Sequence, residues 1–446
     1  MSSPDPTASA ANPPPQGLIG RIKAHLAPGR FGRHLSYNLI QTGVEVGALT
    51  LVSLVVARIY GPHLFGILAL VLSGAQWISM VVDGFIIAQM RAVAEEATRQ
   101  IEAAARVGWR CVGGALGLSL ALSLLLVLGV FLWRLELLTD WWPEIAAAVF
   151  VAVSRLGKYA IEAAFRGLRN FAIPALWACL LAPLQAAALI VLAMKGYGPF
   201  WYLMVMGGFQ TLNMGLLALS YARQYFRAPA EPAQATLASV FAYAVPLLPR
   251  GALGYFHFKV NTVILAAFFG EAAAGHFGLA ERVLLVPLLL YGVIVNAVSP
   301  RVAALKATGD EEGLRAMTHR TYGLVLAVSF PLAAAFLLNG LVIRPLFPQY
   351  TDATEMVQWL GWCLPLLGLS YVATGAILVQ GGHPKAALWV SLATGVVNVA
   401  AVWLGARFGG PVLAVAGGSL AQIAASIAGI IVTHRLLNLP FRLRLF

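Results

Sequence analysis

Long apolar runs alternate with short polar connectors along nearly the whole chain. The runs are roughly 20 residues long, the length at which an α-helix crosses a hydrocarbon core about 30 Å thick. An even number of such runs places both ends of the chain on the same side of a membrane. We expect about twelve membrane-spanning helices, at residues 34–58, 64–89, 107–133, 143–165, 172–194, 199–222, 239–270, 276–299, 321–343, 357–380, 385–406 and 411–434.

The composition agrees with this pattern. Hydrophobic residues make up 60% of the chain and charged residues 11%, with a mean hydropathy of +0.80. A soluble domain carries about 25% charged residues. We therefore predict an all-α polytopic membrane protein. Residues 1–33 are rich in Pro, Ser and Ala and lack the basic start and apolar core of a signal peptide, so we expect a disordered tail there.

The placement of Lys and Arg predicts the orientation. With a cytoplasmic N-terminus, twenty Lys and Arg residues fall on the inner connectors and five on the outer ones. Because cytoplasmic connectors are enriched in Lys and Arg, we expect both termini in the cytoplasm and the chain in the cell inner membrane. The net charge of +12 is then explained by orientation and by contact with anionic headgroups. We expect the membrane, and no nucleic acid, as a partner.

The same arrangement of two glycines at the end of an apolar run occurs twice in the sequence. The stretch "IYGPHLFGILAL", which starts at Ile59, has a counterpart in "FFGEAAAGHFGLA", which starts at Phe268. In each, a long apolar run ends at an aromatic residue and a glycine, and a second glycine follows five residues later. Four pairs of landmarks recur in the same order at offsets of 209 to 214 residues: Gly61 and Gly270, Arg91 and Arg301, Gly167 and Gly381, and Gly198-Pro199 and Gly410-Pro411.

This recurrence predicts two related halves, although chance repetition in a chain rich in Gly, Ala and Leu is the alternative. We expect six-helix lobes at residues 34–224 and 239–435, a cytoplasmic linker at 225–238 and a cytoplasmic tail at 436–446. Since six is even, both halves enter the membrane in the same direction, and an axis along the membrane normal relates them. A central cavity then lies between the lobes.

The same landmarks carry a resemblance to a known family. The stretches "ARIYGPHLFGILALV" and "GHPKAALWVSLATGVVNVAAVWL" resemble those of the bacterial polysaccharide (O-antigen and exopolysaccharide) flippases of the multidrug/oligosaccharidyl-lipid/polysaccharide exporter superfamily, and the similarity runs from about residue 34 to 435. It implies two six-helix lobes around a V-shaped cavity. It also implies movement of an undecaprenyl-pyrophosphate-linked oligosaccharide from the cytoplasmic to the periplasmic leaflet, with a polysaccharide polymerase as a partner.

Several charged residues fall within the predicted spans. A charge at the centre of a bilayer costs about 2.5–3.5 kcal/mol on insertion scales, so each is a candidate for function. We expect substrate-binding cations in the cavity, where they suit a pyrophosphate or an acidic sugar. Four acids are candidates for ion coupling or for charge partners. The cations are Arg155, Lys158, Arg250 and Lys259, and the acids are Glu45, Asp83, Glu162 and Glu281.

Structural pairing is the competing interpretation of these charges. Lys158 and Glu162 are four residues apart and face each other on one helix, and Glu281 adjoins Arg282. Glu45, on the same helical face as Gln41, is expected as a partner of Arg250 or Lys259, and so is Asp83. Arg250, His257 and Asn261 form one predicted stripe, and Pro246 and Pro249 open or kink the helix beside it.

Three functions remain open at this stage. The lipid-linked oligosaccharide flippase is favoured, because a cationic cavity repels a cationic drug. The second function is that of a cation-coupled multidrug exporter of the same superfamily. Lipid II flippases are a further relative within the flippase interpretation, but they usually carry two extra C-terminal spans. A membrane-embedded glycan enzyme is disfavoured by the short outer connectors. We expect no enzyme activity, metal or cofactor, since the sequence holds no GxxxxGK[ST] or HExxH motif and no cysteine cluster.

Overall fold

The computed structural model describes residues 30–133, 135–226, 232–245 and 247–438. Residues 1–29, 227–231 and 439–446, which include most of both predicted tails and part of the predicted linker, lie outside these ranges. The described chain is helical throughout and contains no strand. Its helices are α2 (Arg30–Ala97), α3 (Ile101–Trp133), α4 (Leu135–Gly167), α5 (Ala172–Met194), α6 (Pro199–Tyr225), α7 (Leu237–Ala244), α8 (Leu248–Thr308), α9 (Glu311–Leu337), α10 (Gly340–Leu346), α11 (Thr351–Val372), the π-helix η1 (Ala373–Leu378) and α12 (Pro384–Leu436).

Eight helical stretches among the described residues are long and apolar enough to cross a membrane, which makes this a multi-pass membrane protein. Two of them, Ile40–Ala97 and Lys385–Leu436, have 58 and 52 residues. A single crossing takes about 20. Each contains a break at a glycine, Gly61 in α2 and Gly410 in α12, and α8 has a similar break at Gly270. All three breaks fall at the boundary between two predicted spans.

The first landmark of the repeat is a glycine whose backbone conformation other residues rarely adopt. Gly61 has φ 72° and ψ 176°, and Gly270 has φ 80° and ψ −176°. This combination is open to glycine and strongly disfavoured for residues with a Cβ atom. The two glycines therefore reverse the chain in the same way, 209 residues apart.

The second landmark is a close contact between the two halves. A Cβ atom added to Gly66 would collide with the carbonyl oxygen of Glu271, and one added to Gly275 would collide with that of Pro62. Pro62 and Glu271 are themselves equivalent positions of the repeat. The contact is thus reciprocal, as in an interface with twofold symmetry. Both glycines are required so that α2 and α8 approach closely.

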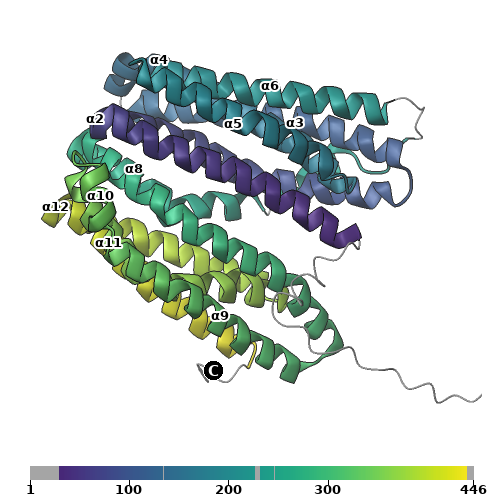
Figure 1. Cartoon of the computed structure of the whole chain (residues 1–446). Coiled ribbons are helices and arrows are strands. Elements are labelled where there is room, and N and C mark those ends of the chain that lie inside the picture. Colours follow the sequence, from purple (N-terminus) through teal and green to yellow (C-terminus); the bar gives the residue numbers. More distant parts are fainter. Residues whose placement is uncertain (1–29, 134, 227–231, 246, 439–446) are drawn as a thin grey trace, which may run out of the picture.

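The hydrophobic core is joined at one end of the molecule and divided at the other. Near the breaks at Gly61 and Gly270, one cluster contains Val56 and Phe65 of the first half together with Phe277 and Tyr350 of the second. Toward the opposite end, one cluster belongs to the helices α2 to α7 and another to α8 to α12. Figure 1 shows the corresponding arrangement, with the purple to teal helices on one side and the green to yellow helices on the other.

Two predicted spans are interrupted. The run expected as one helix over 239–270 is divided between α7, which ends at Ala244, and α8, which begins at Leu248. The run over 321–343 ends as α9 at Leu337, and the short α10 follows from Gly340. Apolar content predicts both runs correctly, but it does not report the turns that proline and Asn-Gly introduce within them.

Candidate functional site

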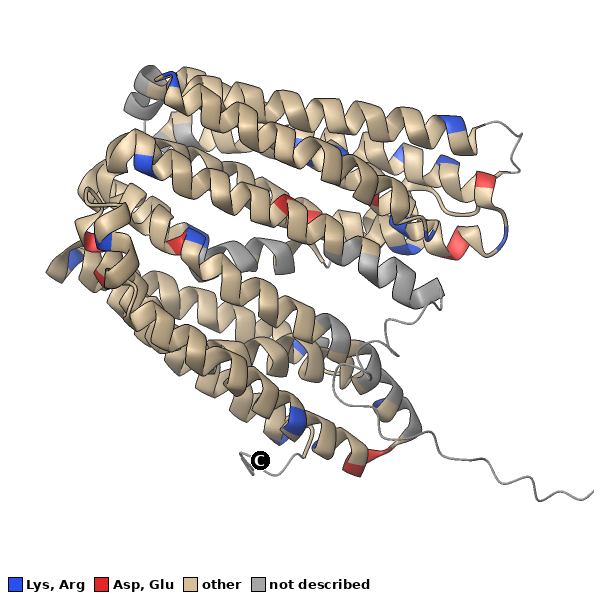
Figure 2. Cartoon of the chain, viewed as in Figure 1, with Lys and Arg blue, Asp and Glu red and all other residues tan. Residues whose placement is uncertain are grey.

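A charged face runs along α4 in the first half. Arg155, Lys158, Glu162 and Arg166 are three or four residues apart, so an α-helix places them on one side. Only 4% of Lys158 and 2% of Glu162 is exposed. Figure 2 shows that most charged residues gather near helix ends and that few lie in mid-helix. Buried charges of this kind need partners, because an unpaired one is costly in an apolar surrounding.

Ion pairs connect this face to α2. Nζ of Lys158 lies 2.7 Å from Oε1 of Glu45 and 3.3 Å from Oε1 of Glu162. Oε2 of Glu162 lies 3.3 Å from Nη2 of Arg166. Gln41 donates a hydrogen bond of 3.5 Å to Glu45. The expected ion pair between Lys158 and Glu162 and the shared face of Gln41 and Glu45 are therefore confirmed.

The partner of Glu45 differs from the prediction. We expected Arg250 or Lys259 of the second half, whereas the carboxylate pairs with Lys158 of the first half. The physical reason is packing, since α2 lies against α4 within the same bundle. Spacing along the sequence identifies charges that share a helix face, but it carries no information about which helices are neighbours.

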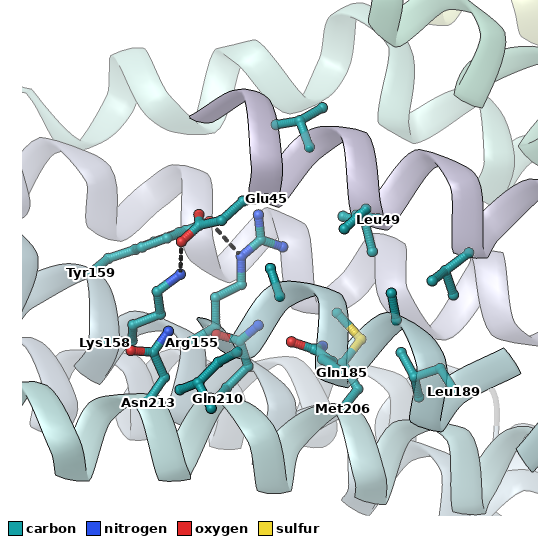
Figure 3. Close-up of a pocket in the computed structure, with 16 residues that line it drawn as sticks. Glu45, Leu49, Arg155, Lys158, Tyr159, Gln185, Leu189, Met206, Gln210 and Asn213 are labelled. Atoms are coloured by element: carbon teal, nitrogen blue, oxygen red, sulfur yellow. Dashed lines mark hydrogen bonds and ion pairs between the residues drawn. The ribbon is translucent and has the colours of Figure 1, made fainter. Parts of the chain in front are cut away.

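Arg155 and Lys158 line one pocket, of about 110 Å³, between α2, α4, α5 and α6. Figure 3 shows Arg155 reaching across this pocket toward α2, beside Glu45. Nε of Arg155 donates a 3.1 Å hydrogen bond to the hydroxyl of Tyr159, and the guanidinium lies 5.3 Å from the centre of the Tyr159 ring. Within the described ranges no carboxylate oxygen lies within 4.0 Å of Arg155. Its charge is therefore not neutralised by direct contact.

Three side-chain amides complete the polar lining, from Gln185 of α5 and from Gln210 and Asn213 of α6. Oε1 of Gln210 and Oδ1 of Asn213 are buried and accept no hydrogen bond from any residue that the structure describes. A buried polar group without a partner costs about 1–3 kcal/mol. These amides therefore favour a ligand that brings hydroxyl groups or other hydrogen-bonding groups into the pocket.

A second group of charges lies on α8, on both sides of the break at Gly270. Nζ of Lys259 is 2.5 Å from Oε1 of Glu281, and both side chains are nearly buried. Glu281 thus pairs with Lys259 rather than with its sequence neighbour Arg282. Arg282 is only 8% exposed, and no carboxylate lies within 4.0 Å of it in the described part of the chain.

The two groups of charges lie on helices that meet at the seam between the halves. Glu45 is on α2, Lys259 and Glu281 are on α8, and these two helices pack against each other. Three carboxylates stand against five cations in these groups, which leaves an excess of two positive charges. The carboxylates are Glu45, Glu162 and Glu281, and the cations are Arg155, Lys158, Arg166, Lys259 and Arg282.

The predicted stripe of Arg250, His257 and Asn261 is only partly described. α8 runs through Arg250 and His257, but their side chains lie outside the described residues. Asn261 is buried and accepts a hydrogen bond of 2.9 Å from Asn398 of α12, so it holds helices of the second half together. Asp83 is exposed near the end of α2 and does not line the pocket.

The family follows from comparison with known sequences. The sequence profile described as "Polysaccharide biosynthesis protein" matches residues 31–306, which is more than half of the chain. The chain belongs to this family. No curated protein matches the sequence. The resemblance to the polysaccharide flippases of the multidrug/oligosaccharidyl-lipid/polysaccharide exporter superfamily is thereby confirmed.

Solved structures show that this family member has the fold of that superfamily. An outward-facing multidrug resistance MATE transporter superimposes with a TM-score of 0.61 at 14% identity, covering 93% of this chain and 97% of the other. A superfamily transporter from Pyrococcus furiosus, described as having a binding pocket of reverse polarity, gives the same values. A MATE transporter of Vibrio cholerae in the bent form gives 0.54 at 16% identity, covering 88% and 98%. The protein is a membrane transporter and not an enzyme.

Several residues of the charged face and of the pocket were not expected from the sequence. Arg166 was counted among the cytoplasmic cations, yet its spacing of four residues from Glu162 was a visible signal for pairing. Gln185, Gln210 and Asn213 were visible as polar residues inside apolar spans. Tyr159 had no such signal, because its role depends on the position of the Arg155 side chain.

Proposed function

We propose that this transporter moves an undecaprenyl-pyrophosphate-linked oligosaccharide from the cytoplasmic to the periplasmic leaflet of the inner membrane, for synthesis of a surface polysaccharide such as O-antigen or exopolysaccharide. The two cations that have no carboxylate within 4.0 Å among the described residues, Arg155 and Arg282, carry the proposal. A pyrophosphate is anionic and accepts charge-assisted hydrogen bonds, which Arg155 is well suited to donate. The amides of Gln210 and Asn213 supply hydrogen bonds for sugar hydroxyls.

The architecture that fits this function has twelve spans in two six-helix lobes, at residues 34–224 and 239–435. The reciprocal contact of Gly66 and Gly275 supports an axis between the lobes. Alternating access then consists of opening this contact at one end while the lobes close at the other. Under this proposal both termini lie in the cytoplasm. Of the cavity cations expected from the sequence, Arg155, Lys158, Arg250 and Lys259, it is Arg155 that contacts the substrate, because Lys158 and Lys259 are already paired with carboxylates.

A cation-coupled multidrug exporter is the second candidate. Two of the three superfamily structures reported above are MATE transporters, and Glu45 and Glu162 are carboxylates on which a coupling ion could bind. The same acids already balance Lys158, so the exporter would have to carry a cationic drug past the uncompensated Arg155 and Arg282. The charge of the substrate separates the two candidates.

The experiment that tests the proposal is depletion of the protein in its own host, with mass spectrometry of lipid-linked glycans and quantification of surface polysaccharide. We expect an undecaprenyl-linked repeat unit to accumulate as the surface polymer falls. Re-expression of the full chain reverses both changes. Unchanged lipid-linked glycans together with increased sensitivity to cationic drugs would instead establish the exporter.

A further inference from the structure

A second pocket, of about 330 Å³, lies on the seam between the two halves. Its volume falls in the range of about 300–1,000 Å³ that is typical of small-molecule sites. It uses a different part of α2 from the charged pocket, after the break at Gly61. All of its lining residues are apolar: Leu70, Val71, Gly74, Ala75, Trp77, Ile78, Leu126, Val127, Trp141, Ile145, Ala148, Val149, Val260 and Val263.

Small residues beside large ones explain why this space is open. Gly74 has no side chain, and a Cβ atom there would lie 3.2 Å from Cδ2 of Leu126. The small side chain of Ala148 leaves space beside α4, and the rings of Trp77 and Trp141 line the pocket with broad flat surfaces. α4 is kinked at Trp141, with φ −124° and ψ 23°. The shape of the pocket thus follows from the sizes of these side chains and from the kink in α4.

The pocket adjoins the charged group on α8. Val260 follows Lys259 directly in the chain, and Val263 lies about one turn further along. Lys259 pairs with the buried Glu281, whereas Val263 is 39% exposed at the edge of the seam. Because Lys259 and Val263 are four residues apart, they lie on one helix face, and the apolar wall directly follows the ion pair. Arg282, which follows Glu281 and has no carboxylate within 4.0 Å among the described residues, leaves a net positive charge in this group, and a net positive charge near an apolar pocket complements an amphiphile with an anionic head and a hydrocarbon tail.

We propose that this pocket holds the part of the isoprenoid tail nearest the head group of the transported lipid, while its pyrophosphate lies near Arg282. The inference rests on the proposed function and extends it, because it names where the tail passes between the halves. In a bilayer the tail is already in apolar surroundings, so shape and packing against Trp77 and Trp141 provide the selectivity.

Photo-crosslinking of the full chain in liposomes tests the position of the tail. A photoreactive amino acid replaces Val263, and in a matched control it replaces Val396, which is 60% exposed on α12 away from the first half. The probe is radiolabelled undecaprenyl pyrophosphate. We expect labelling at residue 263 that excess unlabelled undecaprenyl pyrophosphate removes and excess phosphatidylglycerol does not. Equal labelling at both positions, or equal competition by phosphatidylglycerol, would overturn the proposal.

Filling the pocket provides a second test. We expect Val263→Trp to reduce transport roughly tenfold at unchanged protein level. A tenfold effect corresponds to the loss of about ten carbon–carbon contacts between the tail and the pocket. Val396→Trp should transport normally. If Val263→Trp also transports normally while Arg155→Ala does not, the tail site is wrong and the proposed function stands. If neither Val263→Trp nor Arg155→Ala impairs transport, the cationic-cavity mechanism fails as well.

Discussion

Arg155 differs from Lys158 in how its charge is balanced. Lys158 is held between two carboxylates, whereas Arg155 contacts the hydroxyl and ring of Tyr159 and faces the pocket. A cation that is already paired is poorly available to a substrate, because binding would have to break an existing ion pair. Arg155 is therefore the residue of this pocket best suited to contact an anion.

We predict that Arg155→Ala lowers transport by about 10- to 100-fold, since a hydrogen bond to a charged group contributes about 1.5–3 kcal/mol. Arg155→Lys should retain part of the activity, because lysine keeps the charge but not the planar two-pronged donor. Surface polysaccharide in a deletion strain measures the effect, with immunoblotting for protein level. Arg223→Ala, at an exposed cation on α6, is the control. Normal polymer with Arg155→Ala would exclude this role.

Lys158 is predicted to act mainly in stability. Lys158→Met leaves Glu45 and Glu162 without their shared partner, and breaking a buried ion pair from one side costs about 3–5 kcal/mol. We expect a clear fall in the melting temperature of the detergent-purified protein. The double variant Lys158→Met/Glu162→Met should recover part of the loss, because it removes a buried charge of each sign. A melting temperature for Lys158→Met equal to that of the wild type would contradict the structural role.

At the scale of elements, the helices α2 and α8 determine how the halves meet. Each is broken by a glycine with positive φ, and each contributes a second glycine to the reciprocal contact. Tyr350 and Gln349 reinforce this end by donating hydrogen bonds of 2.8 Å to the carbonyl oxygens of Ala57 and Arg58. The contact therefore combines close backbone packing with hydrogen bonds between the halves.

We predict that Gly66→Ala and Gly275→Ala impair transport to a similar degree, since each adds a methyl group that collides with the partner's backbone. Gly43→Ala is a matched control on α2, because a Cβ atom there meets nothing within 4 Å. Transport and protein level are measured for all three variants. Full activity in Gly66→Ala and Gly275→Ala, or an equal loss of activity in Gly43→Ala, would contradict the requirement for close approach at this end.

The same elements show the limit of sequence reasoning about the site. The helix face of Arg155, Lys158 and Glu162 followed from spacing alone, because neighbours on a helix are fixed by its geometry. The pairs of Glu45 with Lys158 and of Lys259 with Glu281 did not follow, since each joins segments that only packing brings together. The break after Ala244 agrees with the kink or opening expected from the prolines there. The turn after Leu337 was missed, because hydropathy averages over a window and is insensitive to local backbone conformation.

At the scale of the whole molecule, the division of the hydrophobic core describes one conformation of a transporter. The halves share a cluster at the end that contains Phe65 and Tyr350. At the other end, one cluster joins α2 to α7, and so includes Val240 and Ala244 of the predicted second lobe, and a separate cluster joins α8 to α12. Alternating access requires that this arrangement reverse. The shared cluster must then separate, and the two other clusters must approach each other.

Distances between spin labels test this reversal. We predict that labels at Arg58 and Gln349 and labels at Thr98 and Glu312 report opposite changes, in a background without the three native cysteines. Because Gly66→Ala disfavours the closed contact, it should shift the first pair to longer distances and the second to shorter ones. Pulsed electron paramagnetic resonance on the protein in liposomes measures both. A lengthening of both distances would indicate loss of structure instead of alternation.

The sequence by itself determined that this is a helical membrane protein with a repeated pattern, the helix face that carries Arg155 and Lys158, and the family. These properties depend on composition, on local periodicity and on glycines that a particular backbone conformation requires. Only the tertiary structure decided which charges neutralise one another, that Arg155 and Arg282 have no carboxylate in contact among the described residues, and that an apolar pocket adjoins Lys259. These depend on distances between segments far apart in the chain, which packing fixes and sequence spacing does not encode.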